Sequence, residues 1–190
     1  MTPDITPKDE QFLQSYGLTA RSEIAFFTRQ PALLLTYMVL SLGSYGLYWF
    51  YRNWDAVRVA SGHKMLPLLR AIFAIFYAWP LFKIMILQAR ERGFDQNYSG
   101  GALALGYLVP NILAGLNSSG SDMQDDTFLA TEIVVAIISV CMLLLAQHAV
   151  IYNNPLKRTT MHSPVTKFEV FFIILVCVLP IVLNLSVYNQ

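Results

Sequence analysis

The stretch TFLATEIVVAIISVCMLLLAQHAVIYN, residues 127–153, decides the fold class. Apart from His148, its one acidic or basic residue is Glu132, and apolar or small side chains fill every position from Ile133 to Ala146. A helix needs about 20 mostly apolar residues to cross a hydrocarbon core about 30 Å thick. Residues 127–153 are long enough, so the sequence predicts a membrane-spanning helix here.

Four further runs are apolar enough to enter a bilayer. In chain order, the five segments are residues 31–51, 66–88, 101–117, 127–153 and 168–188. A helix satisfies its backbone hydrogen bonds within one segment, which lipid requires. We therefore predict an all-α, polytopic transmembrane bundle of about five membrane segments, residues 31–190, preceded by a cytoplasmic N-terminal arm, residues 1–30, in which residues 24–27 can touch the membrane interface.

The first two segments allow a second interpretation, in which they are re-entrant or interfacial. Gly43 and Gly46 interrupt residues 31–51, and Pro80 interrupts residues 66–88. The second segment also carries Arg70 and Lys83, which are separated by only about 20 Å of helix. We expect five crossings because residues 31–51 have a normal length. Two hairpins that enter and return are the alternative.

The distribution of Lys and Arg sets the expected orientation, because cytoplasmic loops are enriched in these residues. With the N-terminus inside, most loop cations are cytoplasmic in the five-crossing arrangement, and all of them are cytoplasmic in the hairpin arrangement. Both arrangements place the acidic loop at residues 117–126 and the C-terminus outside. The N-terminus is therefore expected in the cytoplasm.

Composition supports lipid as the main partner. The chain has 190 residues, of which 55% are hydrophobic and 13% charged, whereas soluble proteins average about 25% charged residues. Its 13 Lys and Arg residues are balanced by 12 Asp and Glu residues. A nucleic-acid-binding protein would normally show a basic stripe, so nucleic acid is excluded as an expected partner.

Residues 47–60, LYWFYRNWDAVRVA, combine aromatic rings with cations. The cluster comprises Tyr48, Trp49, Tyr51, Arg52, Trp54 and Arg58. Trp and Tyr favour the headgroup level of a membrane, where the ring is half buried and its polar atom stays hydrated. The pattern indicates an interfacial aromatic-basic cluster on a helix that leaves the membrane and runs along its surface.

Polar side chains within the apolar runs are the remaining candidates for a site. Charged groups at membrane depth are costly and tend to face a bundle interior or a water-filled path. Arg70, Asn111 and Glu132 form a possible intramembrane polar site, with Arg70 and Glu132 as a charge pair. The simpler interpretation is that each group stays hydrated near an interface or bridges two helices. Asn111, next to the small residues Ala102 and Gly106, fits such helix–helix bridging best.

The run Tyr45-Gly46-Leu47-Tyr48-Trp49-Phe50-Tyr51-Arg52-Asn53-Trp54, followed by Arg70-Ala71-Ile72-Phe73, resembles a pattern in uncharacterised bacterial multi-pass inner-membrane proteins. The resemblance covers roughly residues 26–93. It implies a location in the bacterial inner membrane, which would make the outer side the periplasm. It implies no activity, cofactor or catalytic residue.

Catalytic motifs are missing from the sequence. There is no H-E-x-x-H, G-x-S-x-G, P-loop or dinucleotide-binding glycine pattern, and the three histidines share no metal-ligand spacing. No catalytic, cofactor-binding or metal-binding residue is therefore predicted. The expected function is a non-enzymatic interaction, assembly or envelope-maintenance component, with a membrane protein or a second copy of the chain as partner. The alternative is a small oligomeric transporter or channel with a polar path near Arg70, Asn111 and Glu132.

Overall fold

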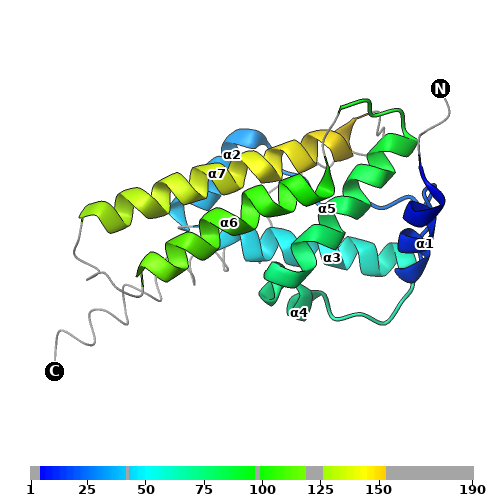
Figure 1. Ribbon diagram of the computed structural model, residues 1–190, viewed down its shortest axis with the longest axis horizontal. Helices are drawn as coiled ribbons and strands as arrows, with labels where there is room; N and C mark the ends of the chain where they lie inside the picture. The colour runs from blue at the N-terminus through cyan, green and yellow to red at the C-terminus, as the bar shows by residue number, and fades with distance from the viewer. Residues whose placement is uncertain (1–4, 42, 97–98, 119–125, 153–190) are drawn as a thin grey trace.

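The computed structural model describes residues 5–41, 43–96, 99–118 and 126–152. Within these residues every regular element is a helix (Figure 1): α1 Pro7–Ser15, α2 Pro31–Leu40, α3 Tyr45–Ser61, α4 Pro67–Ile72, α5 Ala74–Glu91, α6 Gly100–Ser118 and α7 Asp126–Ile151. The predicted all-α class is confirmed for this part of the chain. The fifth predicted segment, residues 168–188, lies outside the described residues.

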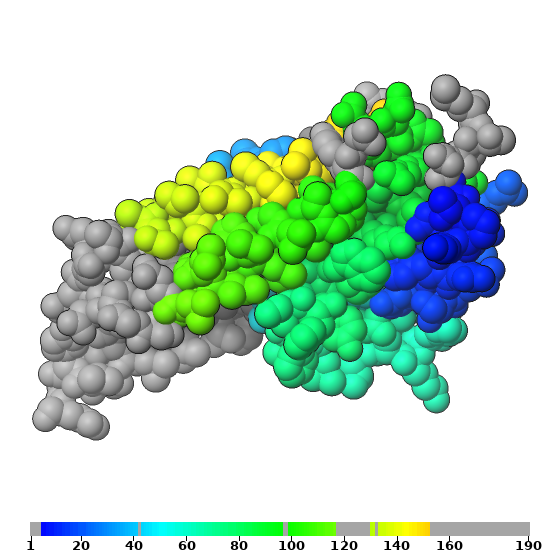
Figure 2. Space-filling model, viewed as in Figure 1, coloured from blue at the N-terminus to red at the C-terminus, as the bar shows by residue number. Residues whose placement is uncertain are grey.

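The third and fourth predicted segments each form one helix. Residues 101–117 lie in α6, which is about 28 Å long, and residues 127–151 lie in α7, which is about 39 Å long. The two helices run antiparallel, side by side (Figures 1 and 2), and we call them the α6–α7 hairpin. Gly106 allows their close approach, since a Cβ there would lie 2.6 Å from Sδ of Met142 on α7.

Residues 31–51 do not form one helix, because the chain reverses between α2 and α3. Gly43 adopts a φ of 85° in the turn, a conformation that glycine reaches without steric cost. The backbone N–H of Phe27, before α2, donates to Oδ1 of Asn53 in α3 at 2.9 Å. The two ends of this segment therefore meet, whereas a crossing would hold them about 30 Å apart. Residues 31–51 therefore form α2 and the beginning of α3, joined by a turn, and not the single continuous helix expected for a crossing.

Residues 66–88 are also divided, with α4 ending before Phe73 and α5 beginning after it. Along α5, residues from Trp79 to Glu91 contact residues 9–21 of the N-terminal arm. Phe12 packs on Trp79, Lys83 pairs with Asp9, and Glu91 pairs with Arg21. The C-terminal part of α5, from Trp79 to Glu91, is therefore packed against the N-terminal arm.

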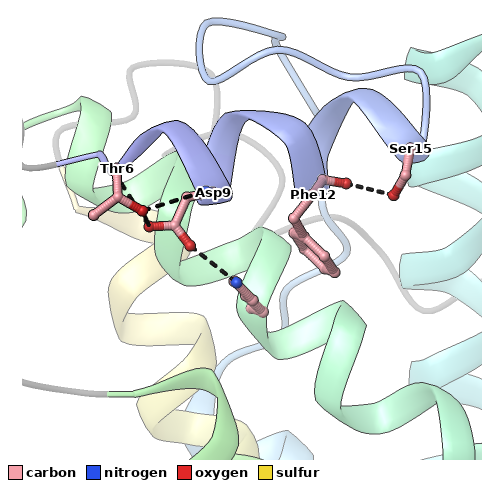
Figure 3. Close-up of polar contacts among 5 residues, drawn as sticks. Thr6, Asp9, Phe12 and Ser15 are labelled. Atoms are coloured by element: carbon pink, nitrogen blue, oxygen red, sulfur yellow. Dashed lines mark hydrogen bonds and ion pairs between the residues drawn. The ribbon is translucent and has the colours of Figure 1, made fainter.

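The N-terminal arm belongs to the same core as the helices. Four of its apolar side chains are almost fully buried: Leu13, Leu18, Ile24 and Phe26. Helix α1 begins at a capping box in which Thr6 Oγ1 accepts from the backbone N–H of Asp9, and the Asp9 carboxylate accepts from Thr6 (Figure 3). The arm therefore contributes apolar side chains to the core, a role that was not predicted from the sequence.

Charge is unevenly distributed in the molecule, whereas large apolar side chains are exposed both along α6 and α7 and around α4 and the start of α5, where Leu66 and Phe76 are examples. We call α1, α3, α4, α5 and residues 16–30 the head; it lies toward one end of the molecule, and the tip of the α6–α7 hairpin projects at the other (Figure 1). Helix α6 contains no charged residue. Large apolar side chains are exposed along the hairpin: Leu105, Val109, Ile112, Leu113, Leu116, Val134 and Ile137.

Among the described helices, α7 alone is long and apolar enough by length and composition to span a membrane, over Ile133–Ile151. Half of its most apolar stretch is buried inside the protein, and the core helix of a soluble protein can meet the same criterion. Gly100–Leu116 and Pro31–Leu40 are shorter apolar helices. The evidence for a membrane-spanning helix therefore rests on α7.

Candidate functional site

The aromatic rings of α3 form the centre of the core. Tyr48, Trp49 and Trp54 are no more than 2% exposed. Trp49 packs near Phe82 of α5, with ring centroids 6.1 Å apart. These rings therefore face protein side chains, whereas the sequence pattern indicated half-buried rings at a membrane interface. They tie α3 to the other helices of the head.

The cationic members of the same cluster point outward. Arg52 and Arg58 are exposed and Tyr51 is half-buried. Arg58 donates to Asp55 at 2.7 Å, one turn earlier on α3, and the guanidinium of Arg52 lies 5.2 Å from the ring centre of Phe27. The aromatic and basic residues of this sequence thus separate into a buried side and an exposed side of one helix.

Three buried carboxamides hold the extended part of the arm. Asn53 Oδ1 accepts from the N–H of Phe27, Gln147 Oε1 accepts from the N–H of Arg29 at 2.7 Å, and Gln88 Nε2 donates to a backbone carbonyl of the arm at 3.0 Å. Each side chain is at most 3% exposed and comes from a different helix, α3, α7 or α5. Since residues 16–30 form no helix or strand, these side chains satisfy backbone groups that would otherwise be buried without partners.

Asn111 joins the two helices of the hairpin. Its Nδ2 donates to the hydroxyl of Ser139 on α7 at 2.8 Å and to the carbonyl of Tyr107, one turn earlier on α6, at 2.6 Å. The interpretation of Asn111 as a helix–helix bridge is confirmed. Gly106 also lies at this contact, whereas Ala102 is exposed. The small pair therefore contributes through its glycine.

Arg70 has different neighbours from Asn111. Its guanidinium carbon lies 4.4 Å from the ring centre of Trp54, 5.4 Å from that of Tyr16 and 5.2 Å from that of Tyr77. Nη1 of Arg70 is buried without a hydrogen-bond partner among the described residues. These rings belong to the head, and the partners of Asn111 belong to the hairpin. Glu132 lies on α7, and its side chain is outside the described part of the structure.

Lys83 is held in the head by an ion pair and two rings. Its Nζ lies 2.9 Å from Oδ1 of Asp9, 4.5 Å from the ring centre of Phe12 and 5.6 Å from that of Trp79. Burial raises the pKa of Asp9, but hydrogen bonds from Lys83 and Thr6 lower it by more, so the net pKa lies below the ordinary 3.8. Asp9 is therefore ionised at neutral pH and joins α1 to α5.

Two further pKa shifts occur in the head. Burial lowers the pKa of Arg92, and the charge of Glu23 offsets part of that effect. Burial also raises the pKa of the Tyr16 phenol, while the charge of Arg70 acts in the opposite direction. Neither shift reaches neutral pH, because an arginine remains protonated and a tyrosine remains neutral there. These groups supply fixed charge and packing rather than a titrating acid or base.

Two hollows beside the loop between α3 and α4 were not predicted from the sequence. They measure about 460 Å³ and about 300 Å³ and share His63, Lys64 and Met65 as lining residues. The ring of His63 packs against Gly17, where an added Cβ would lie 2.7 Å from it. Gly17 has a φ of 70°, which a glycine tolerates best. The loop is thereby fixed against the end of α1.

Comparisons with known proteins supply no further assignment. No family model matches the chain, and no curated protein or solved structure matches it. Within the described residues, no group of three or more His, Cys, Asp or Glu side chains could hold a metal ion. The function must therefore be argued from the arrangement of the helices and the chemistry of their surfaces.

Proposed function

We propose that this chain is an integral protein of the bacterial inner membrane that acts as a non-enzymatic interaction, assembly or envelope-maintenance component. The observation that carries the proposal is the exposed apolar surface of the hairpin. The hairpin exposes large apolar side chains such as Leu113 (60%) and Leu116 (69%), and α6 holds no charge. Burying such side chains in hydrocarbon is favourable at roughly 25 cal/mol per Å².

In the proposed topology α6, α7 and residues 168–188 cross the bilayer. Residues 31–61, which contain α2 and α3, enter from the cytoplasmic side and return to it, and α4 and α5 stay at that side. The closure of the chain between Phe27 and Asn53 supports this arrangement. It also places every cationic loop in the cytoplasm, as the enrichment of Lys and Arg in cytoplasmic loops favours. The N-terminus is then cytoplasmic and the C-terminus periplasmic.

The head supports the assignment as an interaction component. It is fixed to the hairpin by the Gln147 hydrogen bond. Phe94, just after α5, also packs on Tyr152, just after α7, with ring centres 5.3 Å apart. The outward side of the head carries exposed Arg52 and Arg58. A rigid, charged platform held at the membrane surface is suited to binding a second membrane protein or another copy of the chain.

Cysteine labelling tests the topology. In a chain with Cys141→Ser and Cys177→Ser, single cysteines replace Leu113 on the hairpin and Val59 on the head, both of which are exposed. A membrane-impermeant maleimide should label Val59→Cys in inverted membrane vesicles and should leave Leu113→Cys unlabelled until detergent is added. Equal labelling of the two cysteines before detergent would contradict the proposal.

Photo-cross-linking in native membranes tests the interaction role. A photoreactive residue at Arg52 should give a reproducible protein adduct, and the same residue at Leu113 should give mainly lipid adducts. A transporter would behave differently: the protein in liposomes would carry a solute, and Arg70→Ala or Glu132→Gln would reduce that flux. Solute flux without any protein adduct at Arg52 would replace our proposal with the transporter alternative.

A further inference from the structure

The hollows beside the loop between α3 and α4 are basic. The smaller one is lined by Ser15, Tyr16, His63, Lys64, Met65 and Arg70. The larger one shares His63, Lys64 and Met65 and is also lined by Arg58. None of these lining residues is acidic. Arg58 is already paired with Asp55, whereas the described residues provide no carboxylate partner for Lys64 or Arg70. The smaller hollow therefore concentrates two uncompensated positive charges.

Arg70 lines the smaller hollow and supplies its second positive charge. Three aromatic rings, the nearest being that of Trp54 at 4.4 Å, surround the central carbon of its guanidinium. One of the guanidinium nitrogens, Nη1, is buried and has no hydrogen-bond partner among the described residues. A phosphate matches this geometry, since arginine recognises its oxygens with planar, paired N–H donors.

The surface beside the hollows is strongly apolar. Leu66 is 66% exposed, Leu68 55% and Ile72 54%, and they flank or lie within α4. Exposed apolar groups next to cations are typical of segments that insert at a membrane interface, with the cations at the level of anionic headgroups. A soluble phosphate compound would use the cations and leave these side chains in water. The pairing of the two features favours a lipid.

We propose that Lys64 and Arg70 bind the phosphate of an anionic phospholipid in the cytoplasmic leaflet, while Leu66 and Leu68 lie among its acyl chains. This inference rests on the proposed membrane location and adds a ligand class to it. The lipid site would fix the depth of α4 and therefore the level of the whole head. His63, held against Gly17, keeps the loop in place in the absence of lipid.

Native mass spectrometry of the full-length chain in neutral detergent tests the site, with phosphatidylglycerol and phosphatidylcholine as probes. The unmodified chain should retain phosphatidylglycerol more tightly than phosphatidylcholine. Lys64→Gln with Arg70→Gln should weaken phosphatidylglycerol binding by about tenfold or more, because each cation near an anionic headgroup contributes substantially. Lys8→Gln with Arg21→Gln is the matched control, since it removes the same charge at exposed positions away from the hollows and should change binding less than about twofold.

Two additional variants and a competition with inorganic phosphate distinguish a lipid site from a site for soluble phosphate and from a folding defect. Lys64→Gln alone, on an exposed loop position, keeps the test valid if loss of Arg70 disturbs folding, and it should weaken binding several-fold. Inorganic phosphate should compete only weakly, and Leu68→Asn should weaken lipid binding without affecting binding of phosphate.

Equal retention of the two lipids, or equal losses in the double variant and its control, would overturn the lipid site. Tight binding of inorganic phosphate that is unaffected by Leu68→Asn would reassign it to a soluble ligand. The labelling of Leu113→Cys decides the membrane location separately, so failure of the lipid site and failure of the proposed function give different results.

Discussion

Three glycines of α6 give a graded prediction about helix packing. At Gly100 an added Cβ would lie 2.6 Å from both the Cα and the N of Lys83, which are backbone atoms of α5. At Gly106 it would meet the flexible end of Met142, and at Gly115 nothing lies within 4 Å. Alanine should therefore be most costly at Gly100, less costly at Gly106 and harmless at Gly115.

The size of each change in the free energy of unfolding depends on which atoms must move to accommodate the added Cβ. Gly100→Ala forces α5 and α6 apart by about 1 Å, and such overpacking costs roughly 1–3 kcal/mol. The gain in helix propensity, at most about 1 kcal/mol, is smaller at the first residue of a helix than in its interior. Gly106→Ala can be relieved by a rotamer change of Met142, so its net effect should be below about 1 kcal/mol. Gly115→Ala should stabilise by up to about 1 kcal/mol.

Thermal unfolding in detergent, followed by circular dichroism, measures this series. The order of stability should be Gly115→Ala, then the unmodified chain and Gly106→Ala close together, then Gly100→Ala. A Gly100→Ala variant as stable as Gly115→Ala would show that α5 and α6 do not approach at Gly100. The packing of α6 on α5 would then be refuted at this contact.

Three other substitutions test single interactions. Asp9→Asn should lower the free energy of unfolding at pH 7 by about 0.5–1 kcal/mol. Because the folded pKa of Asp9 is lowered from 3.8, the difference in stability from the unmodified chain should vanish as the pH falls through that lower value. A difference that persists at pH 2 would contradict the ion pair. Asn111→Ala removes the bond to Ser139 and should cost about 0.6–2 kcal/mol in detergent unfolding, whereas Ser139→Ala in the same background should add little. Asn53→Leu leaves the N–H of Phe27 without its acceptor and should cost about 1–3 kcal/mol, and it should speed hydrogen exchange at residue 27; unchanged exchange there would argue against this contact.

The hairpin could be predicted closely from the sequence. Residues 101–117 and 127–153 correspond to α6, Gly100–Ser118, and α7, Asp126–Ile151. Long runs without charge have few alternatives, because a helix both fits their length and satisfies their backbone. The role of Asn111 followed from the same local pattern, since polar amides and small residues such as Gly106 on an apolar helix are typical of helix–helix contacts.

The course of residues 31–51 could not be predicted in the same way. The glycines at 43 and 46 indicated a break, but the direction after the break depends on the contact between Phe27 and Asn53, which are far apart in the sequence. A run of normal length favoured one continuous helix, whereas the structure has two helices whose flanking residues meet. Local composition therefore gave the helices and not the turn between them.

The burial of the aromatic cluster could not be predicted for a related reason. Trp49 and Trp54 suit a membrane interface and a protein core equally, because each setting rewards burial of a large ring. The sequence also contained no signal that Arg70 would lie over Trp54 or that Lys64 would share a hollow with it. Those groups come together only when the arm, α3 and α4 are packed, so the basic hollows could be found only in the structure.

Extraction of membranes with alkaline carbonate tests the central claim most directly, which is that hydrocarbon surrounds the exposed apolar side chains of α6 and α7. Membranes from cells that produce the full-length chain are washed at high pH without detergent and pelleted. We predict that the chain stays in the pellet and is released only by detergent. Recovery in the supernatant would contradict the account, because a chain held only by the surface of its head is removed by that wash.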